Sequence, residues 1–251
     1  MGSTAETDMP ALTGKVALVT GGSRGIGRAI AVSLAEAGAS VAVNYREKAA
    51  EAAATVEVIR RAGGRAIAVG ADVSQATAVG GMVTEVAREL GKIDVLVNNA
   101  GIGLVRGIDD LTEADFDLTI AVNLKSVFLC TQAVLPSMRA KKWGRIVNIS
   151  SGAARGAGGV GPHYNASKAG MEGLTRGYAA RLVKEGITVN AVAPSLIETD
   201  MVRQGLASAA SRIPLGRFGT SEECAQVAMM LIGNAYMTGQ TVALSGGLSF
   251  L

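Results

Sequence analysis

The chain alternates short apolar runs with longer segments of helical periodicity along almost its whole length. The runs expected to form strands are 16–19, 41–43, 66–69, 93–97, 145–149, 188–192 and 241–244, and the segments expected to form helices are 25–37, 48–61, 75–90, 112 to about 139, one that carries position 164, and 222–232. Parallel strands need crossovers of about a dozen residues or more, and right-handed helical crossovers cover both faces of the sheet. The sequence therefore predicts an α/β fold with a doubly wound, Rossmann-type parallel sheet of seven strands.

The length and composition favour one folded domain. The chain has 251 residues, of which 49% are hydrophobic and 18% are charged, as is typical of a globular protein with a substantial core. We expect a flexible leader over 1–12, whose first ten residues lack an apolar core, and a single catalytic domain over 13–251. Within that domain 195–220 has weak periodicity, and we expect it to form a lid over the site.

Charge, hydropathy and cysteine content argue against several kinds of partner. No uninterrupted apolar run approaches the roughly 18–20 residues of a membrane span. The net charge of +3 comes without a dense basic run, so neither a membrane nor a nucleic acid is an expected partner. Cys130 and Cys224 lie far apart without a disulfide framework or metal-ligand spacing. They suit a reducing cytoplasm, and no metal site is predicted.

A glycine-rich turn follows the first predicted strand and opens the first predicted helix. It reads Thr20-Gly21-Gly22-Ser23-Arg24-Gly25-Ile26-Gly27, a Gly-x-x-x-Gly-x-Gly spacing. Glycines allow a tight turn and the close approach of backbone to a pyrophosphate, while the helix N-terminus supplies N–H groups and a positive dipole end. An ordinary strand–helix turn is the alternative, but the complete strand–helix–strand context favours dinucleotide binding.

The end of the second predicted strand bears on which dinucleotide is bound. An NAD site usually carries an Asp or Glu there, whereas this chain has Asn44-Tyr45-Arg46. Arg46, together with Arg24 from the glycine turn, could pair with a 2′-phosphate, which favours NADP(H). The alternative is that Arg46 is a solvated surface charge and that Glu47 plays the acidic part.

Tyr164 and Lys168 stand four residues apart at the start of a predicted helix. Residues at that spacing share one helix face, so an ammonium is held beside a phenol. A neighbouring positive charge favours the phenolate and is expected to lower the tyrosine pKa, making Tyr164 a candidate proton donor to a ketone oxygen. A solvated Lys one turn from a surface Tyr is the alternative when the spacing is considered alone.

Five motifs in order give the chain a specific resemblance. They are Thr20 with its glycine turn, Asn98-Asn99-Ala100-Gly101, Asn123, Asn148-Ile149-Ser150-Ser151 and the Tyr164/Lys168 pair, with Ser151 thirteen residues before Tyr164. Together they resemble the short-chain dehydrogenase/reductase family over about 15–247. The chain looks nearest to 3-oxoacyl-acyl-carrier-protein reductase-like carbonyl reductases.

The resemblance implies a role for each catalytic candidate. Ser151 would hydrogen-bond the substrate oxygen, with Ser150 as the competing choice, and Tyr164 would be the acid/base. Lys168 would lower the pKa of Tyr164 and hold the nicotinamide ribose. Asn123 would position a water for proton relay, or alternatively serve at a helix kink.

The resemblance and the turn chemistry also imply a set of cofactor-binding residues. Asn99 would contact the inner ribose side, Asp72 would meet the adenine or instead form a turn before Ser74, and the segment after the sixth strand would hold the carboxamide. The full predicted set is Gly21, Ser23, Arg24, Gly25, Ile26, Gly27, Asn44, Tyr45, Arg46, Asp72, Val73, Asn99, Ala100, Gly101, Tyr164, Lys168, Pro194, Ile197 and Thr199.

Two departures from the family pattern concern the substrate. Pro194 is followed by Ser195 where the family commonly has Gly, which adds a side chain near the carboxamide. Glu185 occupies a position where acyl-carrier reductases usually carry a basic residue, which is unfavourable for docking an acidic carrier. His163, beside Tyr164, is expected to be a pocket-wall or surface residue, because adjacent helix positions do not face each other.

The sequence thus favours an NADPH-dependent, cytoplasmic enzyme that reduces a ketone to a secondary alcohol, its substrate a 3-oxoacyl thioester or a small carbonyl compound. A sensor that binds NADP(H) without turnover is the alternative. An enoyl reductase fits less well, because those relatives separate Tyr and Lys by six residues and here the gap is three. The family resemblance also implies a homotetramer, to which the apolar C-terminal end could contribute.

Overall fold

Seven parallel strands form one sheet in the computed structural model, which describes residues 11–198 and 207–249. The strands are β1 (Val16–Val19), β2 (Ser40–Tyr45), β3 (Ala66–Gly70), β4 (Val95–Asn98), β5 (Gly144–Ile149), β6 (Ile187–Pro194) and β7 (Thr241–Leu244). Their order across the sheet is β3-β2-β1-β4-β5-β6-β7, with every neighbouring pair parallel. The order reverses at β1/β4, the topological switch point where ligands bind in open sheets of this kind.

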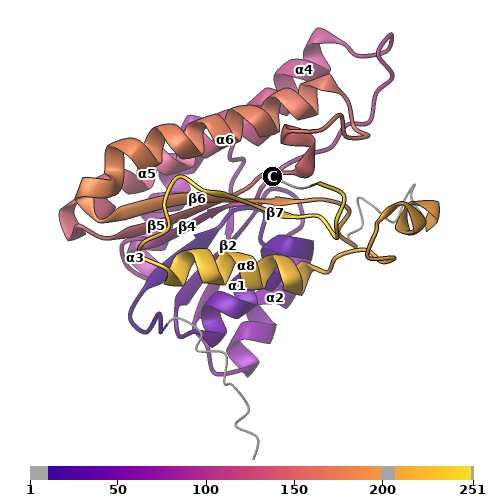
Figure 1. Ribbon diagram of the computed structural model, residues 1–251. Coiled ribbons are helices and arrows are strands. Elements are labelled where there is room, and N and C mark those ends of the chain that lie inside the picture. The colour runs from indigo at the N-terminus through magenta and orange to yellow at the C-terminus, as the bar shows by residue number, and fades with distance from the viewer. Residues whose placement is uncertain (1–10, 199–206, 250–251) are drawn as a thin grey trace, which may run out of the picture.

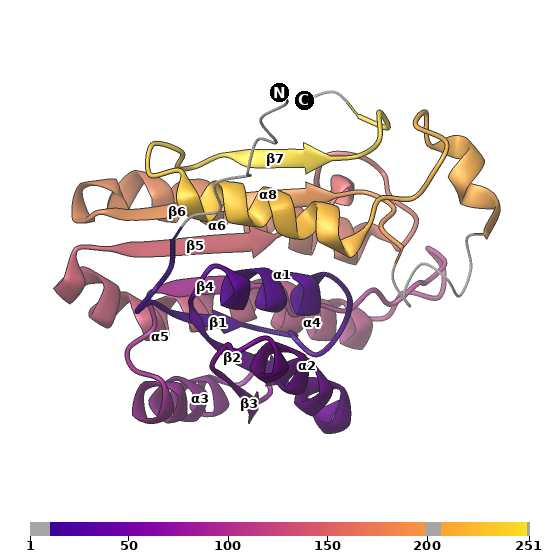
Figure 2. The same cartoon turned by 90° about the horizontal axis from the view of Figure 1, so that it is seen from below.

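Helices cover both faces of the sheet. They are α1 (Gly25–Glu36), α2 (Ala49–Arg61), α3 (Ala76–Glu89), α4 (Glu113–Ile120), α5 (Ser126–Lys141), α6 (Pro162–Leu182) and α8 (Ser221–Gly233). One apolar core joins α1, α2 and α8 to the sheet, and the other joins α3, α5 and α6 to its opposite face. The two layers are visible in Figure 1, and Figure 2 shows the strands side by side behind α1, α2 and α8.

The buried strands explain why the sheet is parallel. Each residue of β1, β4, β5 and β6 is buried, which is the near-continuous apolar pattern of a sheet covered on both sides. The predicted fold class is therefore confirmed. The predicted strand bounds hold to within about two residues, and β1 and β7 match at both ends.

The long helix predicted from 112 to about 139 has a feature that periodicity did not indicate. A π-helical turn (Ala121–Lys125) separates α4 from α5, so the helical run continues with one widened turn that contains Asn123. Thr112 caps the run through a reciprocal capping box with Asp115. Turns of this type are frequent at functional sites.

This run, Glu113–Lys141, is also long and apolar enough to cross a membrane, with a mean hydropathy of 1.6 over its most apolar window. Half of that window is buried against the rest of the protein. The core helix of a globular protein passes the same test, so the run is weak support for a membrane segment.

The predicted lid at 195–220 is described only in part, and Thr199 lies outside the described residues. The beginning of the 195–220 segment, just after β6, contacts its end, because Ile197 forms a parallel bridge with Gly219. Between them a 3₁₀ segment (Ala207–Arg212) lies beyond the sheet edge, shown in orange in Figure 1. Whether the segment closes over a substrate stays a prediction.

Candidate active site

A cleft of about 480 Å³ opens at the carboxyl ends of the strands near the β1/β4 switch point. Parallel strands direct their following loops to this one edge, so turns distant in sequence meet there. Its walls come from the glycine turn, the ends of β2 and β3, and the turn after β4. The lining residues are Gly21, Ser23, Arg24, Gly25, Ile26, Asn44, Tyr45, Arg46, Glu47, Lys48, Ala71, Asp72, Val73, Asn99, Ala100, Gly101, Ile102, Val122 and Glu198.

Two glycines of the turn are required by close approach of other backbone and side-chain atoms. A Cβ on Gly27 would lie 2.4 Å from both the Asn99 Nδ2 atom and the Gly21 carbonyl oxygen, so a side chain there has no room. Gly21 has a φ of +60°, and a Cβ there would lie 3.0 Å from the Ala100 Cα atom. Gly27 therefore holds α1 close to the turn after β4 and is not among the residues that line the cleft. Its contact with a cofactor stays a prediction.

Thr20 joins the glycine turn to the turn after β4. Its hydroxyl accepts hydrogen bonds from the backbone N–H groups of Asn99 (3.0 Å) and Ala100 (3.1 Å) and donates to the Val97 carbonyl oxygen (3.3 Å). The Asn99 side chain returns the contact by donating to the Thr20 and Gly21 carbonyl oxygens at 3.0 and 2.9 Å. One hydroxyl thus fixes two walls of the cleft, a role the sequence did not assign to Thr20.

The far end of the cleft carries charges of both signs. Arg46 is half exposed and forms an ion pair with Glu47 at 2.5 Å. Lys48, which the sequence analysis did not single out, also lines this end and lies 3.6 Å from Glu51. Asn44 is buried and supports the turn, because its side chain accepts from the Gly21 N–H and donates to the Val69 and Ala71 carbonyl oxygens.

Asp72 lies at the same end and forms the turn that was its alternative role. Its Oδ1 atom accepts from the N–H and the hydroxyl of Ser74 at 2.9 and 2.7 Å. Burial works to raise the pKa of Asp72, but the Ser74 hydrogen bonds and the charge of Arg46 outweigh it and hold that pKa below its usual value. Asp72 is therefore a carboxylate that faces Arg46 across the cleft.

The catalytic candidates meet where β5 and α6 come together. Lys168 is 4% exposed and donates to the Ile149 carbonyl oxygen at the end of β5 (2.8 Å), while its Nζ atom lies 5.7 Å from the centre of the Tyr164 ring. Tyr164 shares a hydrogen bond with the Ser151 side chain. The Ser150 hydroxyl is buried and contacts the Lys168 carbonyl oxygen and Glu172, so the geometry favours Ser151 over Ser150.

The pKa shifts of Tyr164 and Lys168 differ from those that their spacing predicts. Burial raises the pKa of Tyr164, and the hydrogen bond from Ser151 offsets only part of that rise. Burial also lowers the pKa of Lys168 to about 8. The spacing had suggested that Lys168 lowers the tyrosine pKa; in the protein alone the direction is opposite, because desolvation outweighs a charge that is engaged by a backbone carbonyl.

Asn123 connects the catalytic group to the cleft wall. Its side chain accepts from the Ile102 N–H (2.8 Å) and donates to the Ile102 carbonyl oxygen (2.9 Å) and to Ser167 Oγ (3.2 Å). A Cβ on Gly101 would lie 3.3 Å from Asn123 Oδ1 and 3.6 Å from Lys168 Nζ. The turn after β4 therefore lies directly against both side chains, and the cleft and the catalytic group form one site.

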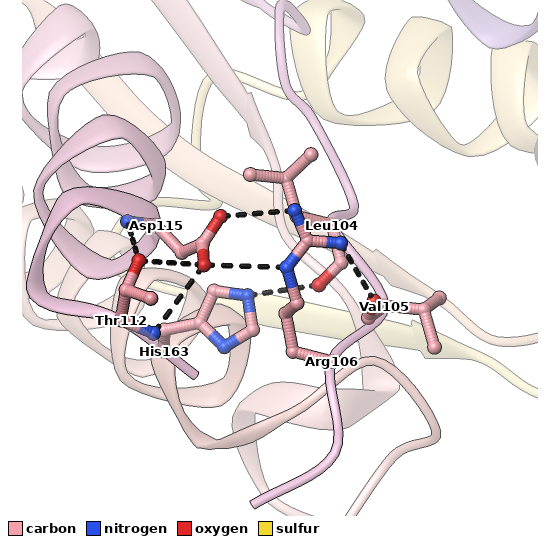
Figure 3. Close-up of polar contacts among 6 residues, drawn as sticks. All are labelled: Leu104, Val105, Arg106, Thr112, Asp115 and His163. Carbon is pink, nitrogen blue, oxygen red and sulfur yellow. Dashed lines mark hydrogen bonds and ion pairs between the residues drawn. The ribbon is translucent and has the colours of Figure 1, made fainter. Parts of the chain in front are cut away.

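His163 is fully buried and supports the segment at 104–106, which follows the turn after β4. Its Nε2 atom lies 2.9 Å from the Leu104 carbonyl oxygen, and Arg106 two residues on forms a two-point ion pair with Asp115 at the start of α4. Figure 3 shows these groups around the segment. His163 is therefore a supporting residue beside Tyr164, neither a pocket wall nor a surface residue.

Most of the predicted cofactor residues line the cleft, and the exceptions have clear locations. Pro194 is the last residue of β6, and Ile197 is 5% exposed and packs into a smaller cavity beside Ser195. Tyr164 and Lys168 lie on the catalytic side rather than in the cleft lining. Lining residues outside the predicted set are Lys48, Ala71, Ile102, Val122 and Glu198, together with Glu47, which was predicted only as the acidic alternative to Arg46. Glu47 and Lys48 directly follow Arg46 in the sequence, and packing brings the other four to the cleft.

The fold and this site define an oxidoreductase that binds a nicotinamide dinucleotide. The short chain dehydrogenase family model matches residues 15–209. The chain belongs to that family, whose members use NAD(P)(H) to act on CH–OH or C=O groups. The close-packed glycine turn, the cleft and the helix N-terminus behind it fit such a cofactor.

Similar proteins span nearly the whole chain. A 3-oxoacyl-[acyl-carrier-protein] reductase of Synechocystis is 44% identical and aligns over 96% of this chain and 99% of its own length. The (2S)-[(R)-hydroxy(phenyl)methyl]succinyl-CoA dehydrogenase subunit BbsD of Thauera aromatica is 42% identical over 94% of this chain and 96% of its own. A solved dehydrogenase/reductase of Sinorhizobium meliloti superposes with a TM-score of 0.87 at 40% identity, covering 94% and 96% of the two chains.

The Thr20 hydroxyl supplies the first testable prediction. Thr20→Val keeps the side-chain shape but leaves the N–H groups of Asn99 and Ala100 without their acceptor, so we expect a loss of about 1–3 kcal/mol in the free energy of unfolding and weaker dinucleotide binding. Urea titration and fluorescence titration with NADPH measure the two effects. Thr20→Ser, which keeps the hydroxyl, is the matched control; equal losses in both variants would contradict the role given to the hydroxyl.

The buried ammonium of Lys168 predicts a pH dependence of stability. Its pKa is about 8 in the folded protein and 10.5 as the reference value, so between these values the unfolded chain holds more protons and stability rises with pH. Relative to Lys168→Met, the wild-type free energy of unfolding should rise by up to about 3 kcal/mol across this window and stay parallel below it. Urea unfolding of both proteins from pH 7 to 10.5 measures the difference. Parallel curves throughout would show that the ammonium is not desolvated.

Proposed function

We propose that the protein reduces a ketone to a secondary alcohol, reversibly, with NADPH as the hydride donor. The observation that carries the proposal is the convergence of Ser151, Tyr164, Lys168 and Asn123 at one end of the dinucleotide cleft. Ser151 follows β5, Asn123 lies in the π-helical turn before α5, and Tyr164 and Lys168 stand at the start of α6. Tyr164 bonds to Ser151, Lys168 to the carbonyl at the end of β5, and Asn123 to the segment after β4. A non-catalytic dinucleotide cleft would not need this set.

The side chains account for the proton part of the reaction. When bound, the nicotinamide supplies the hydride. Tyr164 carries its phenol proton at neutral pH and donates it to the ketone oxygen, and the Ser151 hydroxyl donates a hydrogen bond to the same oxygen as negative charge develops. The Lys168 ammonium favours the phenolate that remains. Asn123 fixes the wall against which the reacting group lies.

The preference for NADPH rests on the charges at the far end of the cleft. Strand β2 ends in Tyr45 without a carboxylate, and Arg24, Arg46 and Lys48 line the cleft beyond it. A 2′-phosphate would take the place of Glu47 beside Arg46. Glu47 and Asp72 are the opposing charges and would favour a ribose hydroxyl instead, so the choice depends on how Arg46 is engaged.

The substrate we favour is a 3-oxoacyl thioester or a small carbonyl compound. The names of the relatives support thioesters, one carried by an acyl carrier protein and the other by coenzyme A. Glu185 forms a two-point ion pair with Arg139 at 2.8 and 3.2 Å. That pair occupies both side chains, so neither offers an uncompensated charge to an acidic carrier, and a thioester that is not carrier-bound is the better fit.

Two further expectations stay proposals. A homotetramer remains in keeping with the exposed apolar side chains of Phe116, Leu118 and Phe128 on α4 and α5 and with β7 at the sheet edge. Sedimentation as a monomer at micromolar concentration would count against it. The cytoplasmic location rests on cysteine usage, since Cys130 and Cys224 are both free and buried.

Replacement of the tyrosine hydroxyl tests the reaction. Tyr164→Phe should lower kcat by about 10²–10⁴-fold, because the proton donor is lost while the aromatic ring stays. NADPH oxidation is followed with an acetoacetyl thioester, a diketone and an aryl ketone, and NADPH binding is measured alongside. Tyr178→Phe, on the same helix but bonded to Gln132, is the control. A wild-type protein that binds NADPH tightly and consumes it with none of these compounds would favour the sensor alternative.

Removal of Arg46 tests the cofactor preference separately. Arg46→Ala should raise the KM for NADPH by about 10-fold and leave the KM for NADH within about threefold, because only NADPH carries the 2′-phosphate. Steady-state kinetics with both cofactors measure the change. Arg61→Ala, which removes an exposed arginine paired with Glu57 on α2, has the same charge change outside the cleft. Equal changes for the two cofactors would contradict the assignment of Arg46 to the phosphate.

A further inference from the structure

Ser195 is held in an unusual backbone setting directly after β6. Its N–H donates to the Leu244 carbonyl oxygen at 2.9 Å, and the next residue, Leu196, has a φ of +49° in the left-handed region. That conformation costs a non-glycine residue of order 1 kcal/mol or more and is found preferentially at ligand-binding positions. Gly219 fixes it, because its N–H donates to the Leu196 carbonyl oxygen at 3.2 Å.

The Ser195 side chain points at the residue that follows Ser151. A Cβ built on Gly152 would lie 2.0 Å from Ser195 Oγ and 3.3 Å from Ser195 Cβ. No real side chain fits at that distance, so Ser195 fills the space that any side chain at position 152 would need. Gly152 does not have a positive φ, so its backbone would accept alanine and only Ser195 excludes it. The two residues therefore form a matched pair, and the Ser195 hydroxyl lies beside the Ser151-Gly152 turn.

This hydroxyl is available for a ligand. Within 11–198 and 207–249, no side chain or backbone group forms a hydrogen bond with Ser195 Oγ, and the residue is only partly buried. Ser195 does not line the dinucleotide cleft, but it borders a cavity of about 60 Å³ together with Ile213 and Leu215. Arg217 and Glu223 also line that cavity. The Ser195 hydroxyl itself lies beside the turn that follows Ser151, where a substrate engaged by Ser151 would come close.

We propose that Ser195 is a substrate-specificity residue whose hydroxyl donates a hydrogen bond to a second oxygen of the substrate, close to the ketone that Ser151 and Tyr164 engage. The chemical class this selects is a 1,3-dicarbonyl compound, such as a 3-oxo thioester, over a ketone that has no second oxygen. The proposal rests on the ketone reduction proposed above. It adds which ketone the site prefers and which atom makes the choice.

The test compares two substrates in three proteins. Wild type and Ser195→Ala are assayed with acetoacetyl-N-acetylcysteamine and with acetophenone. Ser40→Ala, at the amino-terminal end of β2 and far from the site, is the control. We expect the ratio of kcat/KM for the thioester to that for acetophenone to fall about 3- to 10-fold in Ser195→Ala, the effect of one neutral hydrogen bond. The ratio should not change in Ser40→Ala. A purely structural role would lower both values together and leave the ratio unchanged.

A second measurement checks the geometry without relying on activity. Gly152→Ala should lower the melting temperature in the wild-type background, and Ser195→Gly should remove most of that loss in the double variant. An equal loss in both backgrounds would show that Ser195 does not occupy the space beside Gly152 and would overturn the proposal.

The outcomes distinguish failure of the specificity role of Ser195 from failure of the proposed ketone reduction. A wild type that reduces both compounds, with an unchanged ratio in Ser195→Ala, contradicts the specificity role alone. A raised KM for NADPH with an unchanged ratio would place the hydroxyl on the cofactor and also overturn the proposal. A wild type that reduces neither these nor other ketones contradicts the proposed reaction itself, and the role of Ser195 with it.

Discussion

The site depends on the backbone groups left unpaired where the parallel strands end. A strand that stops at the carboxyl edge leaves carbonyl oxygens without a ladder partner, and buried carbonyls need one. Side chains supply such bonds: Lys168 donates to the Ile149 carbonyl and Asn44 to the Ala71 carbonyl just beyond β3. The Thr20 hydroxyl adds a second bond to the Val97 carbonyl, which already accepts from the Thr20 N–H. The same hydrogen bonds that complete the sheet therefore place the residues that do chemistry.

The electrostatics of the catalytic group follow from that arrangement. Lys168 donates to a backbone carbonyl and is only 4% exposed, so burial lowers its pKa. Burial also raises the pKa of the neighbouring Tyr164. Both shifts favour neutral groups. In this state Tyr164 retains its proton, which is the form that can donate to a ketone oxygen.

Contacts between distant elements hold the turns that surround this centre. The π-turn at Asn123, the buried His163 and the Arg106–Asp115 pair all hold the segment after β4, while the left-handed Leu196 holds the segment after β6. These contacts join elements far apart in the chain. They fix two segments beside the catalytic residues.

The sequence by itself determined the fold class, the glycine turn and the Tyr164/Lys168 pair, because strand–helix periodicity and short-range spacing are local properties of a chain. Tertiary structure alone decided the direction of the tyrosine pKa shift, the support that Thr20 and His163 give, and the contact of Ser195 with Gly152. Each of these depends on burial or on atoms from distant segments. Spacing places residues along one element, whereas desolvation and steric fit exist only after the elements have packed.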